Sequence, residues 1–298
     1  MRKYLNEPEL IRFEVKDRIA RITLNKPDKR NTLEDRILTE LRDALVEADA
    51  LVDVNCVILE GAGKDFCAGY DLVGSYSGNW NDDDYRGRGA ASSLDNDIWH
   101  LENTQKLGMT IFDMHKPVIA RVQGNCLAGG TDLALLCDFI IAAENAKIGF
   151  PATRANGTPP TNFWLYHLGP QWAKRMIFTG DCLTGKDAAR LGLVLDAVPA
   201  DQLDAAVDEL ARRLSFVDPD MLSAHKRVLN MGMEFMGARM LQRFAAETDA
   251  RTHLVKGPRR AQFKADMAAG NFKEALKNRD EPFGDGLVKA YWLQQDGE

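Results

Sequence analysis

Short apolar runs alternate with segments of helical periodicity along the first 200 residues, and this alternation constrains the fold more than any other feature. Apolar runs of four to six residues are typical of buried strands. Helical spacing of apolar residues predicts helices near residues 171–178 and 201–214. Strands that alternate with helices predict an α/β protein with crossover connections. The expected strands are residues 56–59, 118–122, 139–143 and 193–198.

The N-terminal segment predicts a β-hairpin followed by a helix. Apolar residues alternate with polar ones over residues 11–15 and again over 20–24, with a Lys16-Asp17 turn between them. We expect Thr32 to be the N-cap of the next helix, because hydroxyl side chains accept bonds from free amides at helix starts. The apolar face of that helix extends to about Ala50.

The chain divides into two sections. Strand patterns end before residue 200, and only helical patterns continue from Pro219 onward. We therefore expect an α/β core over residues 1–200 and a helical section over residues 201–298. Residues 76–96 have no period and are rich in Gly, Asn and Asp. Such a loop is usually mobile or functional, although a solvated insertion without a role explains it equally well.

Composition and charge exclude several classes of protein. The 45% hydrophobic and 28% charged residues are ordinary for a soluble chain, and the formal net charge of -6 disfavours nucleic-acid binding. No apolar run approaches the ~18 residues of a membrane span, and no signal peptide is evident. The 5 scattered cysteines form no CxxC pair, which favours reduced thiols in the cytoplasm. No cluster has metal-ligand spacing.

Two Gly-containing turns each follow a predicted strand and precede a predicted helix. Residues 66–72 read FCAGYDL, and residues 124–134 read GNCLAGGTDLA. Small residues at such positions let a ligand approach the backbone, whose unpaired N–H groups can bind an anion. One such turn is commonplace, but two side by side could form an oxyanion hole.

In this order along the chain, the turns and several other segments resemble the enoyl-CoA hydratase/isomerase (crotonase) superfamily. The resemblance covers roughly residues 8–270. It implies a spiral of ββα units, C-terminal helices that assemble a homotrimer or hexamer, and an acyl-CoA substrate whose CoA takes the place of a separate cofactor. The motifs that carry it are LNKP at 24–27 with Asn31, FCAG at 66–69, KPVIA at 116–120, AGG at 128–130, CD at 137–138, IGFP at 148–151 and TG at 179–180.

The resemblance also implies which residues form the site. The backbone amides of Tyr70 and Gly129 would stabilise the enolate of a thioester, and Lys29 and Arg30 would meet the phosphates of CoA. A solvated basic pair is the alternative interpretation of those two cations. The residues placed around CoA are Lys29, Arg30, Ala68 and Gly69.

The sequence departs from the family where hydratases carry two catalytic glutamates. Asp132 stands at the first position, and Ala152, which cannot move a proton, stands at the second. One acid–base group is worth roughly 10²–10⁴-fold in rate, so we expect slow hydration of crotonyl-CoA. The turn at 153–164 is altered as well. Isomerisation, C–C cleavage, thioester hydrolysis and acyl-CoA binding without catalysis stay open as alternatives.

Other side chains near the two turns have both a catalytic and a structural interpretation. Asp132 is the remaining acid–base candidate, or else a helix-start carboxylate. The Tyr70 hydroxyl either reaches the acyl group or forms a wall of the pocket. Structural roles are favoured for the remaining candidates, which are Asp71, His115, His167, Cys67, Cys126, Trp99, Phe163 and Trp164.

Overall fold

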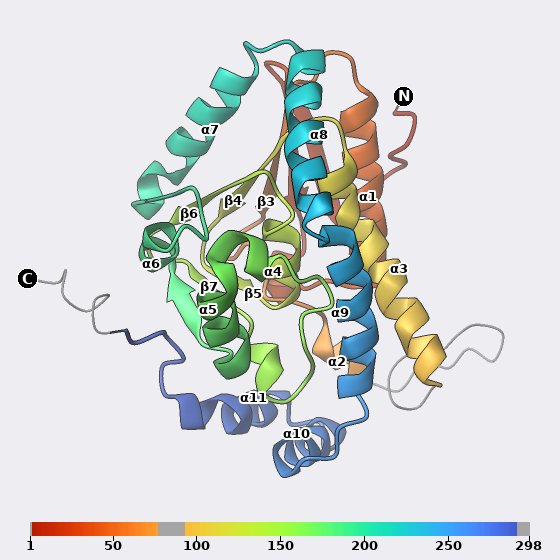
Figure 1. The fold of residues 1–298 in the computed structure, drawn as a ribbon, viewed down its shortest axis with the longest axis vertical. Helices are drawn as coiled ribbons and strands as arrows, with labels where there is room; N and C mark the ends of the chain where they lie inside the picture. Colours follow the sequence, from red (N-terminus) through yellow and green to blue (C-terminus); the bar gives the residue numbers. More distant parts are fainter. Residues whose placement is uncertain (1, 77–92, 291–298) are drawn as a thin grey trace, which may run out of the picture.

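Six strands form the larger of two sheets in a computed structural model that describes residues 2–76 and 93–290 (Figure 1). Their order is β1-β2-β3-β4-β6-β9, with β1 antiparallel to β2 and the other neighbours parallel. The predicted hairpin and the three apolar runs before residue 150 are confirmed as strands. The bounds are β1 Ile11–Lys16, β2 Ile19–Leu24, β3 Cys56–Gly61, β4 Val118–Val122, β6 Phe139–Ala143 and β9 Asp196–Val198.

Strand β9 is shorter than the sequence indicates. Leu193 and Val194 are buried, but both of their amides donate to the Ala188 carbonyl at the end of α6 (Gly185–Arg190), at 2.9 and 3.4 Å. They belong to the turn after that helix, and their apolar character reflects burial in the core rather than pairing in the sheet. The prediction of a strand from residue 193 was therefore wrong by three residues.

A smaller sheet lies beside the larger one and carries the second Gly-containing turn. Its order is β5-β7-β8, with β5 (Asn125–Leu127) parallel to β7 (Lys147–Gly149) and β7 antiparallel to β8 (Cys182–Thr184). Strand β5 leads through Ala128 into the short helix α4 (Gly129–Ala134). The second turn is therefore held between a strand and a helix.

The first long helix begins later than predicted. α1 (Asp35–Ala50) has Glu34 as its N-cap, without a side-chain capping bond, so the assignment of Thr32 was wrong. The reason is tertiary: Leu33 forms a parallel bridge with Tyr70, and its amide donates to the Gly69 carbonyl at 2.8 Å. That bridge keeps the chain extended up to the helix.

Helices cover the sheets and make up the C-terminal section after β9. α7 packs against β3, β4 and β6, and α3 packs against α1 and α9. Part of the predicted loop over 76–96 lies in residues 77–92, outside the described residues; its end is already helical in α3. The remaining bounds are α2 Leu72–Tyr76, α3 Leu94–Asp113, α5 Trp164–Thr179, α7 Leu203–Leu214, α8 Pro219–Phe235, α9 Ala238–Thr252, α10 Pro258–Ala268 and α11 Phe272–Asp280.

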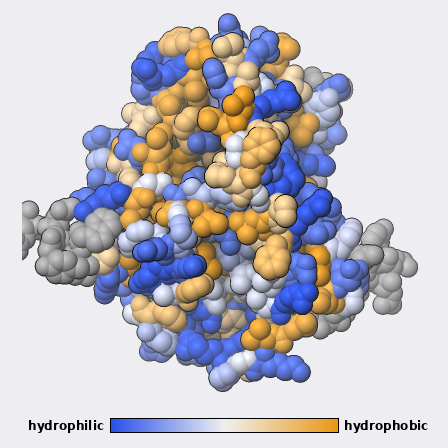
Figure 2. Space-filling model, in the orientation of Figure 1, coloured by the Kyte–Doolittle hydropathy of each residue, from blue (hydrophilic) through white to orange (hydrophobic). Residues whose placement is uncertain are grey.

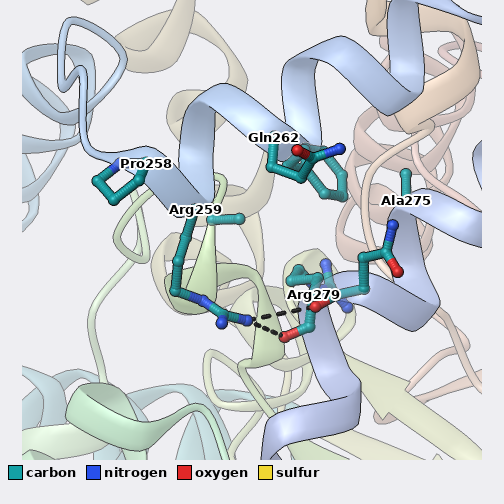
Figure 3. Close-up of a pocket in the computed structure, with 8 residues that line it drawn as sticks. Pro258, Arg259, Gln262, Ala275 and Arg279 are labelled. Atoms are coloured by element: carbon teal, nitrogen blue, oxygen red, sulfur yellow. Dashed lines mark hydrogen bonds between the residues drawn. The ribbon is translucent and has the colours of Figure 1, made fainter.

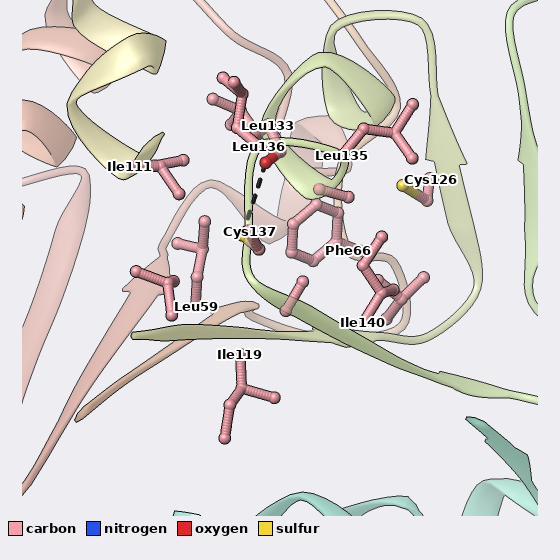
Figure 4. Packing of buried hydrophobic residues seen from close by; sticks show 14 of the residues in the cluster. Leu59, Phe66, Ile111, Ile119, Cys126, Leu133, Leu135, Leu136, Cys137 and Ile140 are labelled. Carbon is pink, nitrogen blue, oxygen red and sulfur yellow. Dashed lines mark hydrogen bonds between the residues drawn. The ribbon is translucent and has the colours of Figure 1, made fainter. Parts of the chain in front are cut away.

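The hydrophobic core fills both faces of the larger sheet. Figure 4 shows Leu59 of β3 on the face that packs against α3 and α4, together with Ile111 and Phe66. Ile119 of β4 points to the opposite face. Leu59 pairs with Ala120, the residue after Ile119, and successive residues of a strand point to opposite faces of the sheet. Burial on both faces explains why the strands read as continuous apolar runs.

A buried lysine ties the helical section to the core. Lys226 of α8 donates to the carbonyls of Ile111 and Lys116 at 2.9 and 3.0 Å, and to Asp138 Oδ2 at 2.8 Å. The same Asp138 oxygen accepts the Val118 amide at 2.7 Å. One ammonium group therefore joins α8 to the end of α3 and to the edges of β4 and β6.

We predict that Lys226→Met destabilises the fold by about 3–5 kcal/mol, because it leaves the Asp138 carboxylate buried without its cation. Urea unfolding at fixed protein concentration measures the change. Lys256→Met, at an exposed position, is the control and should change stability by less than about 0.5 kcal/mol. A Lys226 variant as stable as its control would contradict this account.

Within residues 2–76 and 93–290, the helices are too short or too polar to cross a lipid bilayer.

Candidate functional site

The two Gly-containing turns lie side by side and are joined through their backbones. The Cys67 amide donates to the Asn125 carbonyl at 2.9 Å, and the Leu127 amide donates to the Cys67 carbonyl at 2.9 Å. The approach is so close that a Cβ on Gly130 would lie 2.4 Å from the Cys67 carbonyl oxygen. Only glycine fits at that position.

Two backbone amides at this junction are directed away from the pairing. In a parallel bridge, the residue opposite Leu33 turns its own N–H to the other side; that residue is Tyr70. Gly129 is the first residue of α4, where amides have no intrahelical acceptor. A Cβ on Gly69 would lie 3.5 Å from the Gly129 nitrogen, which places the turns in contact. Within the described part of the chain, neither amide has a backbone acceptor.

Backbone strain is concentrated at the same place. Ala128, the residue before α4, has φ 49° and ψ −118°, a conformation that a side chain with a Cβ rarely adopts. Its amide donates to the Gly149 carbonyl at 2.9 Å, and its carbonyl accepts both the amide and the hydroxyl of Thr131. These bonds hold the strained residue, and with it the direction of the next amide.

Asp132 is a buried carboxyl with one satisfied oxygen. Its exposed fraction is 3%. The Tyr70 hydroxyl donates to Oδ2 at 3.0 Å, whereas Oδ1 has no hydrogen-bond partner. Burial raises the pKa of Asp132 well above its usual range, the Tyr70 bond opposes the shift, and the charge of Asp249 adds to it. This carboxyl therefore holds a proton more tightly than an exposed aspartate does, and its Oδ1 is available to a ligand.

A second group of titratable residues lies near Asp132, and the sequence analysis missed it. Asp249 and His253 project from α9, and the His253 Nδ1 is 2.6 Å from Asp97 Oδ2 of α3. The charge of Asp249 raises the pKa of both Asp132 and Tyr70. The i,i+4 spacing of an aspartate and a histidine on one helix face was the available signal.

The basic residues predicted to bind CoA are exposed beside the first turn. The side chains of Lys29 and Arg30 are 61% and 57% exposed. Lys29 lies 3.6 Å from Asp71 Oδ2, and Arg30 lies 3.9 Å from Asp65 Oδ2. The Ala68 amide donates to the Arg30 carbonyl at 3.0 Å, so the loop and the turn are in contact.

Asp71 is held by neighbouring charges. Its burial alone would raise the pKa, but the Gly74 amide and the ammonium groups of Lys29 and Lys26 outweigh burial, so the pKa of Asp71 is lowered. An ionised carboxylate that caps α2 and pairs with two lysines fits the structural interpretation better than the role of a base. The ion pairs also orient Lys29.

Position 152 carries no acid in this fold. Ala152 lies in a single 3₁₀ turn (Pro151–Arg154), and its carbonyl accepts the amides of Ala155, Asn156 and Gly157. The altered segment then continues without regular structure until α5 begins at Trp164.

The remaining candidates have structural surroundings. His167 Nε2 lies 2.9 Å from the Leu135 carbonyl oxygen, and burial lowers its pKa. His115 lies at the surface against Asp49. Burial raises the pKa of Cys67 to about 12 and that of Cys126 well above its usual range, which makes both thiols poor nucleophiles. Phe163 and Trp164 are buried in the core, whereas Trp99 is partly exposed.

A separate pocket of about 220 Å³ lies between α10 and α11 (Figure 3). Arg259 crosses it and donates to the carbonyls of Asn278 and Arg279 at 3.3 and 2.8 Å. The pocket contains none of the residues predicted for the site. Among the residues that the structure describes, no group of three His, Cys, Asp or Glu side chains is arranged to hold a metal ion.

Comparison with known proteins agrees with this geometry. The family profile described as enoyl-CoA hydratase/isomerase matches residues 14–279. The crotonyl-CoA hydratase of Syntrophomonas wolfei subsp. wolfei is 33% identical over 230 residues, which cover 76% of this chain and 83% of that enzyme. The crystal structure of an enoyl-CoA hydratase from Mycobacterium smegmatis has a TM-score of 0.85 and 33% identity, covering 93% of this chain and 95% of that one.

A second crystal structure, an enoyl-CoA hydratase/isomerase from Xanthobacter autotrophicus Py2, gives a similar result. Its TM-score is 0.84 at 31% identity, covering 92% of this chain and 98% of that one. Together these matches confirm the expected α/β crotonase-like fold, including helices in the C-terminal section. The roles of individual residues stay predictions.

Proposed function

Because the chain belongs to the enoyl-CoA hydratase/isomerase family, we propose that it is an enzyme that adds water to the double bond of an enoyl-CoA thioester. The observation that carries this proposal is Asp132, a buried carboxyl whose pKa is raised and whose Oδ1 has no hydrogen-bond partner. It lies beside two amides that have no backbone acceptor among the described residues. Its relatives include hydratases by name, such as the crotonyl-CoA hydratase of Syntrophomonas wolfei.

The amides of Tyr70 and Gly129 stabilise the enolate that forms on the thioester oxygen. Donors fixed by the fold need no reorganisation when charge develops, and this electrostatic effect is usually the largest single contribution to catalysis. The strained backbone at Ala128 and the bridge between Leu33 and Tyr70 support the assignment, since they fix the direction of the two amides. A backbone amide needs no particular side chain, so the hydroxyl of Tyr70 is available to bond Asp132.

Asp132 supplies the proton that the α-carbon receives. A carboxyl whose pKa is raised by burial is protonated near neutral pH, as a general acid must be. The Tyr70 hydroxyl holds Oδ2 and leaves Oδ1 toward the substrate.

We predict that Asp132→Asn lowers kcat by at least ~10²-fold, because the amide keeps the size of the side chain but cannot deliver the proton. The loss of enoyl-thioester absorbance with crotonyl-CoA and longer enoyl-CoAs measures it, and calorimetry with a saturated acyl-CoA checks that binding is kept. A kcat close to that of the unaltered protein would show that Asp132 has only a structural role at the start of α4.

CoA is bound along the loop that carries Lys29 and Arg30, next to Ala68 and Gly69 of the first turn. Both cations are exposed. Lys29 has Asp71 as an ionic neighbour at 3.6 Å, and Arg30 has Asp65 at 3.9 Å. Contacts of that length are weak in water, so phosphates can take up these cations at small cost. CoA is part of the substrate, and no separate cofactor is required.

Replacing both Lys29 and Arg30 by alanine should weaken acyl-CoA binding by about tenfold or more, because two charge-assisted contacts to phosphate are lost. The loss should be largest at low salt. Calorimetry with free CoA and with butyryl-CoA measures it, and Lys186→Ala, an exposed lysine on α6, is the control. If the double variant and its control bound acyl-CoA with equal affinity, Lys29 and Arg30 would be a solvated basic pair that does not contact CoA.

The helical section presents an apolar surface that fits assembly into a homotrimer or a hexamer. Figure 2 views the molecule from the side of α8 and α9 and shows hydrophobic residues along this face. Phe235 is 86% exposed and Phe244 is 65% exposed. Exposed apolar residues gathered on one face of a soluble protein mark an interaction surface. Others on these helices are Val228, Leu229, Met231, Met236 and Met240.

Light scattering should give three or six times the chain mass of 33.2 kDa. The double change Phe235→Asp and Phe244→Asp should shift the protein toward smaller species, since burying those carboxylates is costly. Val52→Asp changes an equally exposed residue in the turn after α1 and should leave the mass unchanged. A monomer at all working concentrations would refute the assembly.

A further inference from the structure

Three titratable side chains form a chain of contacts beside the site, between α3 and α9. Asp97 Oδ2 lies 2.6 Å from His253 Nδ1, and His253 Nε2 lies 3.8 Å from Asp249 Oδ2. The exposed fractions of Asp97 and Asp249 are both 4%. An imidazole between two buried carboxylates is held in one orientation, with one ring nitrogen toward each. The group is too ordered and too buried to be a surface ion pair.

Asp249 faces the altered segment that replaces the family's second acid. The Thr158 amide donates to Asp249 Oδ1 at 2.7 Å, and the Thr252 hydroxyl lies 3.3 Å from the same oxygen. The segment packs so closely that a Cβ on Gly157 would lie 2.3 Å from that oxygen. The altered segment, which follows Ala152 instead of a glutamate, thus packs its backbone against the Asp249 carboxylate of the C-terminal section.

Two unpartnered polar atoms are an independent observation that points to a polar ligand. Asp132 Oδ1 and Thr158 Oγ1 are both buried without a hydrogen-bond partner. The Thr158 amide bonds Asp249, and the Gly157 amide beside it donates to the Ala152 carbonyl at 3.4 Å, so Asp249 lies one tight turn from position 152. Buried polar atoms are almost always satisfied, so these two oxygens indicate that a polar ligand such as water binds there.

We propose that Asp249 is the second proton-transfer group of this site, in place of the acid missing at Ala152, and that His253 and Asp97 are its positioning residues. The inference rests on the proposed hydration of an enoyl-CoA. It assigns to this reaction a carboxylate from α9, whereas the family pattern places both acids in the α/β core.

The two carboxyls then divide the reaction. The oxygen of a water molecule forms a bond to the β-carbon, and one of its protons passes to the Asp249 carboxylate. The electron pair of the double bond moves onto the thioester as an enolate, held by the amides of Tyr70 and Gly129. The α-carbon takes the proton of Asp132. Transfer of a proton from Asp249 back to Asp132, through solvent, restores the starting state.

The surroundings of the two carboxyls suit these opposite roles. Burial raises the pKa of Asp249 to about 6, with His253 and the Thr158 amide opposing the rise, so it is ionised at neutral pH. Burial raises the pKa of Asp132 well above its usual range, which favours its protonated form. Environments that separate two pKa values in this way are typical of acid–base pairs. The other titratable groups facing this pair are Asp97, Tyr70 and, on α10, Arg260.

The test separates hydration from exchange of the α-proton. Asp249→Asn should lower kcat for crotonyl-CoA by at least ~10²-fold while KM stays within about twofold. It should still exchange the α-protons of butyryl-CoA with deuterium from D₂O at alkaline pD. The Asp132 carboxylate, once ionised, can accept the α-proton, and that step needs only this group and the two amides. Asp132→Asn should lose both activities. Asp181→Asn, a buried aspartate paired with Arg154, is the control and should keep both.

A pH profile tests the positioning residues. In the unaltered protein kcat should fall as pH drops through about 6, where Asp249 becomes protonated. His253→Gln removes the cation that lowers the pKa of Asp249, so the acidic limb should move to higher pH. Asp97→Asn should move it less than His253→Gln does. This change weakens the charge of His253, but it also removes the Asp97 charge, which itself raises the pKa of Asp249.

A carboxylate at position 152 should restore hydration in the Asp249→Asn variant. Ala152→Glu in the Asp249→Asn background should restore at least tenfold of the lost hydration, because it returns a carboxylate to the position the family uses. Hydration retained by Asp249→Asn, or an acidic limb unchanged in that variant, would overturn the inference alone. If the unaltered protein showed neither hydration nor α-proton exchange, the proposed function would be overturned, and the inference with it.

Discussion

The backbone pairing of the two Gly-containing turns is the constraint on which the rest of the site depends. Cys67 bonds to both Asn125 and Leu127, and Gly130 must lack a side chain for this approach. The buried Asn31 secures the first turn from behind, since its amide group donates to the carbonyls of residues 62, 65 and 66. Without this pairing the amides of the two turns would have no common direction.

Burial then decides the chemistry of the carboxyl beside these amides. An ionised Asp132 with one unpartnered oxygen would be costly in so dry a position, so the neutral form is favoured. The Tyr70 hydroxyl reduces that cost only in part, because it bonds one oxygen. Tyr70 thus contributes in two ways: its bridge with Leu33 turns its amide away from the pairing, and its hydroxyl bonds Asp132.

Most of the fold could be predicted from local pattern, because buried parallel strands read as apolar runs and amphipathic helices keep their period. The start of α1 could not, since the bridge of Leu33 to Tyr70 overrides the capping preference of Thr32. The two turns were readable as glycine motifs. The role of Asp249 was not readable, because it depends on how α9 folds back onto the altered turn. The i,i+4 spacing of Asp249 and His253 indicates a pair on one helix face but does not indicate that contact.

The position of Asp249 also links chemistry to assembly. α9 buries Gln242 and Asp249 against the core, while Met240 and Phe244 on the same helix are exposed. Gln242 accepts the Asn162 amide at 2.7 Å and Asp249 accepts the Thr158 amide, so the inner face of α9 holds the altered turn at two points. In the proposed assembly, a subunit that covered the outer face would restrain the same helix. Contacts between subunits would therefore fix the distance between Asp249 and Asp132, although neither residue lies on the exposed face.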